Sequence, residues 1–293
     1  MGAELLDTVI DARKVDLGHG LVVRRVLPFA KRRMVGPFIF LDHAGPVKLP
    51  PEAARQADIR PHPHIGLSTV SYLLSGVVTH RDSLGVEQVI RPGEVNWMTA
   101  GRGISHSERF EDPAAFAGDG LQLLQSWVAL PEAEEETDPA FDNYPVHALP
   151  QARDSGTWMR LIAGDAFGLR SPVRTHSPLF YIHAQMSDGS RIGLPDGHVE
   201  RAAYVVSGGL EFEGSVFRPG QMLVFAAGSH PSLRAVAPCT VMLLGGEPLG
   251  LRHIWWNFVS SRLDRIERAK ADWKAGRIAL PPNDRDEFVA LPE

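Results

Sequence analysis

The sequence of 293 residues contains one cysteine, Cys239, so no disulfide can form within the chain. This composition fits a reducing compartment better than an oxidising one. A surplus of basic residues is also missing, because 30 Lys and Arg side chains stand against 35 Asp and Glu and the formal net charge is −5. Since the chain has no global positive field, we expect no direct contact with nucleic acid.

Long apolar segments are lacking too. No apolar run approaches the roughly 18 residues that a membrane span requires. Residues 1–14 carry acidic side chains and no apolar stretch, which is unlike a signal peptide. We therefore expect a cytoplasmic protein that does not associate with membranes.

Short runs rich in Val, Leu, Ile and aromatic residues alternate with turns, in a chain that contains 28 Gly and 23 Pro. This pattern is typical of an all-β sandwich or barrel. Asp82-Ser-Leu-Gly85 and Asp188-Gly189 are expected to form hairpin turns, because Asp and Gly tolerate a positive φ. The segments predicted as strands are 21–27, 38–41, 67–74, 86–90, 95–98, 121–130, 179–186, 202–206, 222–226 and 240–244.

An internal repeat indicates that the chain folds into two similar barrels. Pro and Gly in the repeated motifs suit loop-to-strand junctions and tight turns. Three motifs recur in the same order at offsets of 132, 127 and 127 residues: Tyr72-Leu-Leu-Ser-Gly76 as Tyr204-Val-Val-Ser-Gly208, Arg91-Pro-Gly93 as Arg218-Pro-Gly220, and Ala100-Gly101 as Ala227-Gly228.

The chain closes with a predicted helix over residues 262–275. Ser260 or Ser261 is expected to cap its start, and Gly276 is expected to end it. The apolar face of this helix, at helical spacing, consists of Leu263, Ile266, Ala269 and Trp273.

His62-Pro63-His64 is the first motif with metal-binding chemistry. On an extended backbone, residues i and i+2 point to the same side, so both imidazoles can reach one ion. Pro63 has no backbone N–H, which predicts an edge strand or the start of a strand. An isolated H-x-H pair remains a weak signal.

A second pair, His106-Ser107-Glu108, follows the turn Gly101-Arg-Gly103 and again places two donor side chains on one face. Together the pairs offer three nitrogens and one carboxylate. That set suits Fe, Mn, Co, Ni, Cu or Zn, but not Cu(I) or an iron–sulfur cluster. Four protein ligands on an octahedral ion leave two positions for water, O₂ or a substrate.

Residues 60–110 resemble the pirin family, a branch of the two-barrel cupins known as bicupins. The resemblance extends over about residues 16–250. Residues 252–260 are similar to a bacterial subgroup and depart from the eukaryotic pattern. The motifs that carry the resemblance are Arg60-Pro-His-Pro-His64-Ile-Gly66, Tyr72-Leu-Leu-Ser-Gly76, His80-Arg-Asp-Ser-Leu-Gly85, Pro92-Gly-Glu-Val-Asn-Trp-Met-Thr-Ala-Gly-Arg-Gly-Ile-Ser-His-Ser-Glu108, and residues 36–38, 41–43, 124–131 and 246–249.

In that family the H-x-H and H-x-E pairs bind one iron-like ion in the N-terminal barrel. The resemblance therefore implies His62, His64, His106 and Glu108 as the metal ligands, with one divalent transition metal in each chain. Fe(II) is the ion that the resemblance favours, while Mn, Ni, Cu, Co and Zn stay open. No organic cofactor is expected.

The fold that the resemblance implies is all-β, with two tandem cupin (jelly-roll-type) β-barrels and a C-terminal helix. The acidic run Glu132–Glu136 is interpreted as a solvated, mobile connection between the barrels. The predicted boundaries are 1–130 for the metal-binding N-terminal cupin, 131–155 for the connecting segment, 156–250 for the C-terminal cupin, and 251–293 for the helix and tail.

The second barrel is predicted to have lost the metal. The repeat offsets give the positions equivalent to the four ligands, in order, as Leu194, Asp196, Leu233 and Ala235. An alternative is a degenerate second site formed by the nearby His198, Glu200 and His230.

Other polar or reactive residues have more ordinary interpretations. His43 and His80 follow apolar segments and are interpreted as side chains that brace loops. Gln125 and Trp127 either line a pocket or belong to the core. Cys239 lies in an apolar stretch and is interpreted as an inert, buried thiol.

Three hypotheses of function follow from the resemblance. The first is a dioxygenase that opens flavonol (quercetin-like) substrates with O₂, in which Glu108 is both a ligand and the general base. The second is a non-enzymatic metal- or redox-sensing regulator that acts through a protein partner. The third is a metal-stabilised barrel with another small-molecule role.

Overall fold

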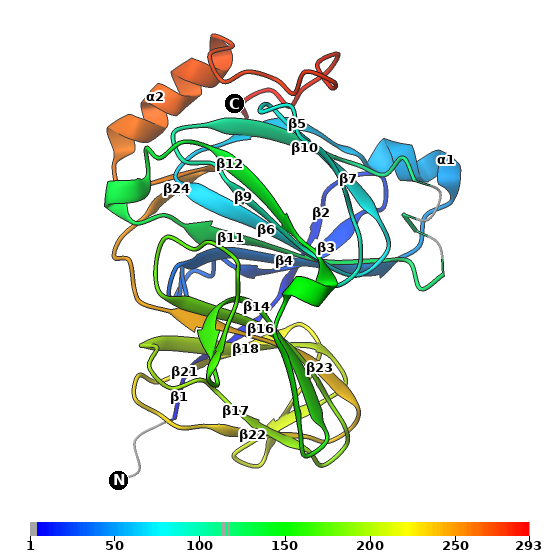
Figure 1. Ribbon diagram of the computed structural model, residues 1–293, viewed down its shortest axis with the longest axis vertical. Helices are drawn as coiled ribbons and strands as arrows, with labels where there is room; N and C mark the ends of the chain where they lie inside the picture. The colour runs from blue at the N-terminus through cyan, green and yellow to red at the C-terminus, as the bar shows by residue number, and fades with distance from the viewer. Residues whose placement is uncertain (1–4, 113–114, 117, 293) are drawn as a thin grey trace. The chain divides into compact units, whose positions relative to one another are not determined.

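The computed structural model describes residues 5–112, 115–116 and 118–292 (Figure 1). The chain forms two compact units. The first unit contains residues 14–23, 42–143 and 249–293, and the second contains residues 1–13, 24–41 and 144–248. The predicted boundaries followed chain order, whereas these units exchange segments. Strand β1 (Leu6–Asp11), for example, pairs with β21 (Gln221–Phe225) in the second unit.

Most of one large sheet, with the strand order β12-β9-β6-β11-β4-β3-β2, and the whole of a small sheet, with the order β5-β10-β7-β8, belong to the first unit. The bounds in the large sheet are β2 Arg13–Asp16, β3 Val22–Leu27, β4 Phe38–Val47, β6 Leu67–Ser75, β9 Val95–Thr99, β11 Leu121–Ala129 and β12 Ala140–Tyr144. Those in the small sheet are β5 Ile59–His64, β7 Val78–Asp82, β8 Glu87–Ile90 and β10 Ile104–Arg109. The remaining elements are α1 Pro51–Ala54, η1 Arg55–Ala57, η2 Glu132–Glu134, the hairpin of β24 His253–Trp255 and β25 Phe258–Ser260, and α2 Leu263–Lys274.

The second unit repeats this plan, with a large sheet in the order β1-β21-β18-β23-β16-β14-β13 and a small sheet in the order β17-β22-β19-β20. Strand β15 adds to β14. The bounds are η3 Val146–Ala148, β13 Gln151–Asp154, β14 Thr157–Ala166, β15 Leu169–Arg170, β16 Leu179–Met186, β17 Arg191–Gly193, β18 Glu200–Ser207, β19 Leu210–Phe212, β20 Ser215–Phe217, β22 Ser232–Ala235 and β23 Cys239–Gly246. Each of the ten predicted strand segments overlaps one strand, and the two-barrel, all-β fold is confirmed.

The repeat is visible in the register of the strands. In the first unit Tyr72 of β6 pairs with Val95 of β9, and in the second unit Tyr204 of β18 pairs with Met222 of β21. Both tyrosines are fully buried. The glycines that end the first repeated motif, Gly76 and Gly208, have positive φ values of 85° and 78°, a conformation that glycine adopts at little cost.

Between its two sheets the second unit is filled with apolar side chains. Its core cluster takes Ile182 and Phe225 from the large sheet, and Leu210 and Leu233 from the small one. In the first unit, a corresponding apolar cluster forms around Leu73, Val78, Ile90, Phe110 and Leu121.

The register also revises which positions of the second unit correspond to the predicted ligands. Leu233 pairs with Ile192, as His106 pairs with His62. The offset at the H-x-H pair is therefore 130 residues and not 132, which makes Ile192 and Leu194, rather than Leu194 and Asp196, its equivalents. The four equivalent positions are thus all buried and apolar: Ile192, Leu194, Leu233 and Ala235.

The acidic run is not a mobile connection, which corrects the interpretation from sequence. Glu135 is 5% exposed and lies 3.2 Å from the buried guanidinium of Arg252. It also accepts hydrogen bonds from the Ser260 hydroxyl at 2.7 Å and from the Ser261 amide at 2.7 Å. Glu136 pairs with Arg265 of α2. These bonds fix the segment after β11 against the end of the chain.

The C-terminal helix forms over nearly the predicted range, but its start differs. Its N-cap is Arg262, without a side-chain cap, because Ser260 and Ser261 bind Glu135 instead. Leu263 is exposed, while the other three residues of the predicted apolar face are buried with Ile65 and Phe258. The helix ends before Gly276 (φ +69°), as predicted. Within the described residues, no helix has the length and apolar character to cross a membrane.

We predict that Glu135→Ala lowers the free energy of unfolding of the first unit by about 3 kcal/mol, because it leaves Arg252 buried without its charged partner. Thermal and urea unfolding measure this loss. The matched control is Glu132→Ala on the exposed side of the same segment, which we expect to change stability by less than about 0.5 kcal/mol. Equal effects of both variants would contradict the structural role of Glu135.

Candidate metal centre

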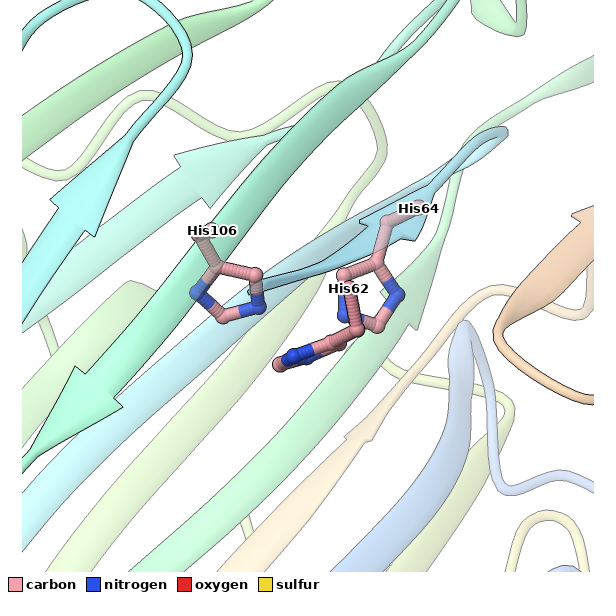
Figure 2. Close-up of side chains that lie close together, drawn as sticks. All are labelled: His62, His64 and His106. Carbon is pink, nitrogen blue, oxygen red and sulfur yellow. The ribbon is translucent and has the colours of Figure 1, made fainter. Parts of the chain in front are cut away.

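Three histidines from two neighbouring strands meet inside the first unit (Figure 2). His62 and His64 lie on β5, which is the edge strand of the small sheet, as Pro63 predicts. His106 lies on β10 directly opposite His62 in the antiparallel register. One ring nitrogen of each residue lies within 4.8 Å of the others, and all three residues are buried.

Backbone carbonyls hold two of these rings by the same nitrogen. His62 Nδ1 lies 2.9 Å from the carbonyl of Arg60, and His64 Nδ1 lies 3.1 Å from the carbonyl of Asn257. A carbonyl only accepts hydrogen bonds, so both Nδ1 atoms carry the proton. The Nε2 atoms are left with free lone pairs, which is the tautomer that binds a metal through Nε2.

Glu108 lies close to the three histidines but outside their group. Its Oε1 atom is 3.6 Å from His106 Nδ1, which is beyond hydrogen-bond distance. Glu108 Oε2 and His106 Nε2 are both buried without a hydrogen-bond partner. Because such atoms carry a desolvation cost, these two mark a place where a ligand is expected.

Burial favours the neutral form of every one of these groups. Desolvation lowers the pKa of His62 to about 4, and it lowers the pKa of His64 and His106 well below the usual value. Desolvation also raises the pKa of Glu108 to about 8. Neutral imidazoles are the form that binds a metal, and a nearby cation would favour the Glu108 carboxylate. The donor set therefore fits a divalent transition metal.

One neighbour of the centre, His80, was assigned differently from sequence. His80 does not brace a loop: it is 3% exposed on β7, its ring centroid is 5.3 Å from that of His106, and it stacks on Phe141. Asp82, two residues later, is fully buried beside it. The signal was present in the sequence, because His80-Arg-Asp82 is a third polar pair at i and i+2. His43 lies in β4, 3.1 Å from the Gln122 amide.

The other candidates take ordinary places. Trp127 lies edge-on to His64 with ring centroids 5.1 Å apart, so it borders the centre. Gln125 accepts a hydrogen bond from Ser71. Burial raises the pKa of the Cys239 thiol to about 11, which supports the interpretation of an inert thiol.

The opposite face of β10 is held by the C-terminal tail. Side chains alternate along a strand, so Ser105, Ser107 and Arg109 point away from the histidines. Ser105 donates to the carbonyl of Ala279 at 2.6 Å, and Ser107 donates to Asp284 at 2.6 Å. Arg109 binds Asp284 through Nε at 2.7 Å. The C-terminal tail therefore holds β10 in place on the face opposite His106.

The candidate second site does not form. His198 is bonded to the carbonyl of Asp165, Glu200 binds Arg32, and His230 is an exposed side chain paired with Asp196. Over the part of the chain that the structure describes, the group of three potential metal-binding residues is His62, His64 and His106.

Comparison with known proteins identifies the family. The sequence model of pirin matches residues 20–128, and that of the pirin C-terminal cupin domain matches residues 181–279. The chain belongs to the pirin family. A pirin-like protein of Caulobacter vibrioides is 54% identical over 290 residues, which are 99% of this chain and all of that protein.

Two solved structures show the same fold as this pirin. The crystal structure of quercetin 2,3-dioxygenase from Acinetobacter baumannii superposes with a TM-score of 0.87 and 32% identity, covering 98% of this chain and 95% of that one. The bacterial pirin YhhW from Escherichia coli, solved in complex with nickel(II), has a TM-score of 0.62 and 19% identity and covers 82% and 99% of the two chains.

We predict that saturating Mn(II) or Ni(II) raises the thermal unfolding temperature of the first unit, because binding to the folded state stabilises it by about 2.7 kcal/mol at a hundredfold excess over Kd. His106→Ala removes this shift. His230→Ala, the matched control in the second unit, retains it. A shift that persists in His106→Ala but disappears in His230→Ala would contradict the position of the centre.

Proposed function

We propose that this pirin-family protein holds one divalent transition metal through His62, His64, His106 and Glu108, and that the centre catalyses O₂-dependent opening of a flavonol (quercetin-like) substrate. The observation that carries the proposal is the convergence of three buried imidazoles. The nearby Glu108, whose buried Oε2 atom has no hydrogen-bond partner, supports its place as the fourth ligand. The likeness to a quercetin 2,3-dioxygenase over nearly the whole chain supports the choice of reaction.

Three nitrogens and one oxygen do not select a single ion, because several divalent metals accept this set. Fe(II) is our first choice, and the nickel(II) complex of YhhW keeps nickel open. When bound, such an ion supplies Lewis acidity and open coordination positions for the substrate and O₂. A cytoplasmic location stays a prediction, based on the single buried Cys239.

The side chains of the protein have separate tasks in this proposal. The three histidines hold the metal through nitrogens whose opposite ring atoms are already hydrogen-bonded. Glu108 takes the proton of the flavonol 3-hydroxyl, since its Oε2 atom is buried and has no other partner. Trp127, edge-on to His64, gives the site an aromatic wall suited to a flat phenolic ring.

We predict that the protein, purified anaerobically and reconstituted in turn with Fe(II), Mn(II), Ni(II) or Cu(II), consumes O₂ when quercetin is added. Glu108→Gln lowers kcat by about 10²- to 10⁴-fold, because the amide accepts no proton. The control, Glu132→Gln, leaves kcat unchanged.

Oxygen electrode traces and quercetin absorbance measure the reaction. If none of the four metal-loaded forms turns over quercetin at a metal content of one ion per chain, the dioxygenase hypothesis is refuted. In that case the regulatory alternative predicts a protein partner that binds only the metal-loaded form.

A further inference from the structure

His106 differs from the other two histidines in what holds its Nδ1 atom. For His62 and His64 the partner is a carbonyl, which leaves no choice of tautomer. The partner of His106 Nδ1 is another imidazole nitrogen, His80 Nδ1, at 3.4 Å. Because an imidazole nitrogen either donates or accepts, this contact alone does not decide which nitrogen of His106 faces the centre with a lone pair.

The tautomer of His106 depends on the residue that binds the other side of the His80 ring. His80 Nε2 lies 3.1 Å from Asp82 Oδ2, and both side chains are buried. A carboxylate only accepts, so a neutral His80 carries its proton on Nε2 and presents a bare Nδ1 to His106. His106 then donates from Nδ1, and its Nε2 atom is left with the lone pair. This is the buried atom that has no hydrogen-bond partner.

We infer that Asp82 and His80 form a positioning pair that sets the tautomer of His106 and aims its Nε2 atom at the metal. The inference rests on the proposed metal centre. Neither residue belongs to the group of three histidines that would hold the ion. They act through His106, as outer partners of metal-bound histidines do in other proteins.

The pair is itself rigidly held. Asp82 Oδ1 accepts hydrogen bonds from the amides of Leu84 at 2.9 Å and Val86 at 3.1 Å, across the turn between β7 and β8. The His80 ring stacks on Phe141 with centroids 4.3 Å apart and planes 18° apart. The predicted turn thus fixes the carboxylate, which orients His80, which orients the ligand.

Asp82→Asn tests the inference with almost no change of shape. The Asn carbonyl keeps the bonds from the Leu84 and Val86 amides, so its NH₂ group faces His80 Nε2 and can only donate. His80 must then carry its proton on Nδ1, and His106 Nδ1 must accept a hydrogen bond from it. The proton of His106 moves to Nε2, where it blocks the metal. We expect the affinity for Mn(II) or Ni(II) to fall by about 10- to 100-fold.

Two readouts are measured on the same protein. Nitrogen-15 NMR of labelled histidines, in the metal-free protein, should show the proton of His106 on Nδ1 in the wild type and on Nε2 in Asp82→Asn. Chelator competition gives the affinity. The matched control is Asp196→Asn, which alters an exposed His–Asp pair with a 2.9 Å contact in the second unit and should change neither readout.

His80→Phe separates a relay from a local effect of the turn. The phenyl ring keeps the stacking on Phe141 but cannot pass on the influence of Asp82. In this background Asp82→Asn should weaken metal binding no further, whereas two independent effects would add. If His80→Phe fails to fold, the tautomers of the Asp82→Asn protein still decide the question.

The outcomes separate this inference from the proposed function. Unchanged tautomers and affinity in Asp82→Asn, in a protein that binds metal through His106, overturn the positioning pair and leave the metal centre standing. A second outcome is a wild-type protein that shows the predicted tautomers but binds no metal. That result supports the hydrogen-bonded arrangement of Asp82, His80 and His106 and contradicts the proposed metal centre. A wild-type His106 with its proton on Nε2 overturns the inference directly.

Discussion

The antiparallel pairing of β5 with β10 is the constraint on which the rest of the site depends. It places His62 directly opposite His106, and the alternation of side chains then brings His64 and Glu108 to the same face. On the other face of β10, Ser105, Ser107 and Arg109 form hydrogen bonds with the C-terminal tail. A one-residue slip in this pairing would exchange the two faces. The outer contacts of β10 therefore protect the geometry of the inner ones.

The two barrels fill the equivalent interior positions with side chains of opposite polarity. In the second unit Ile192, Leu194, Leu233 and Ala235 occupy the equivalent positions, and their burial contributes to stability as in any apolar core. In the first unit the same space holds imidazoles and a carboxylate, whose burial is costly unless each polar atom finds a partner. Carbonyls and His80 satisfy the Nδ1 atoms, and a metal would satisfy the atoms that remain. The first barrel thus buries polar groups at a cost in stability that the second barrel avoids.

Much of this arrangement was readable from the sequence. The repeated motifs led to two barrels, and the apolar strands were found because a face buried in a core has a clear pattern. The H-x-H and H-x-E pairs, together with the resemblance, led to the three histidines that the structure brings together. Strands β5, β7 and β10 were harder to find, since their inward residues are polar.

The errors have physical causes as well. His80 was read as a loop residue because its importance comes from a contact with His106, 26 positions away in the chain. Glu135 was read as solvated because a run of acids is usually exposed, and the buried Arg252 that pairs with it lies far along the sequence. The shift from Asp196 to Ile192 arose because an offset taken from distant motifs does not detect a local deletion. The errors at His80 and Glu135 thus concern long-range contacts, which local patterns do not encode.

The most direct test of the account is anomalous diffraction from a crystal of the protein grown with Mn(II) or Ni(II). We predict one strong anomalous peak in the first unit, at bonding distance from the Nε2 atoms of His62, His64 and His106 and from a carboxylate oxygen of Glu108. The corresponding space in the second unit shows no peak. A metal-saturated crystal with no density among the three histidines, or with the ion held only by other residues, would contradict the account.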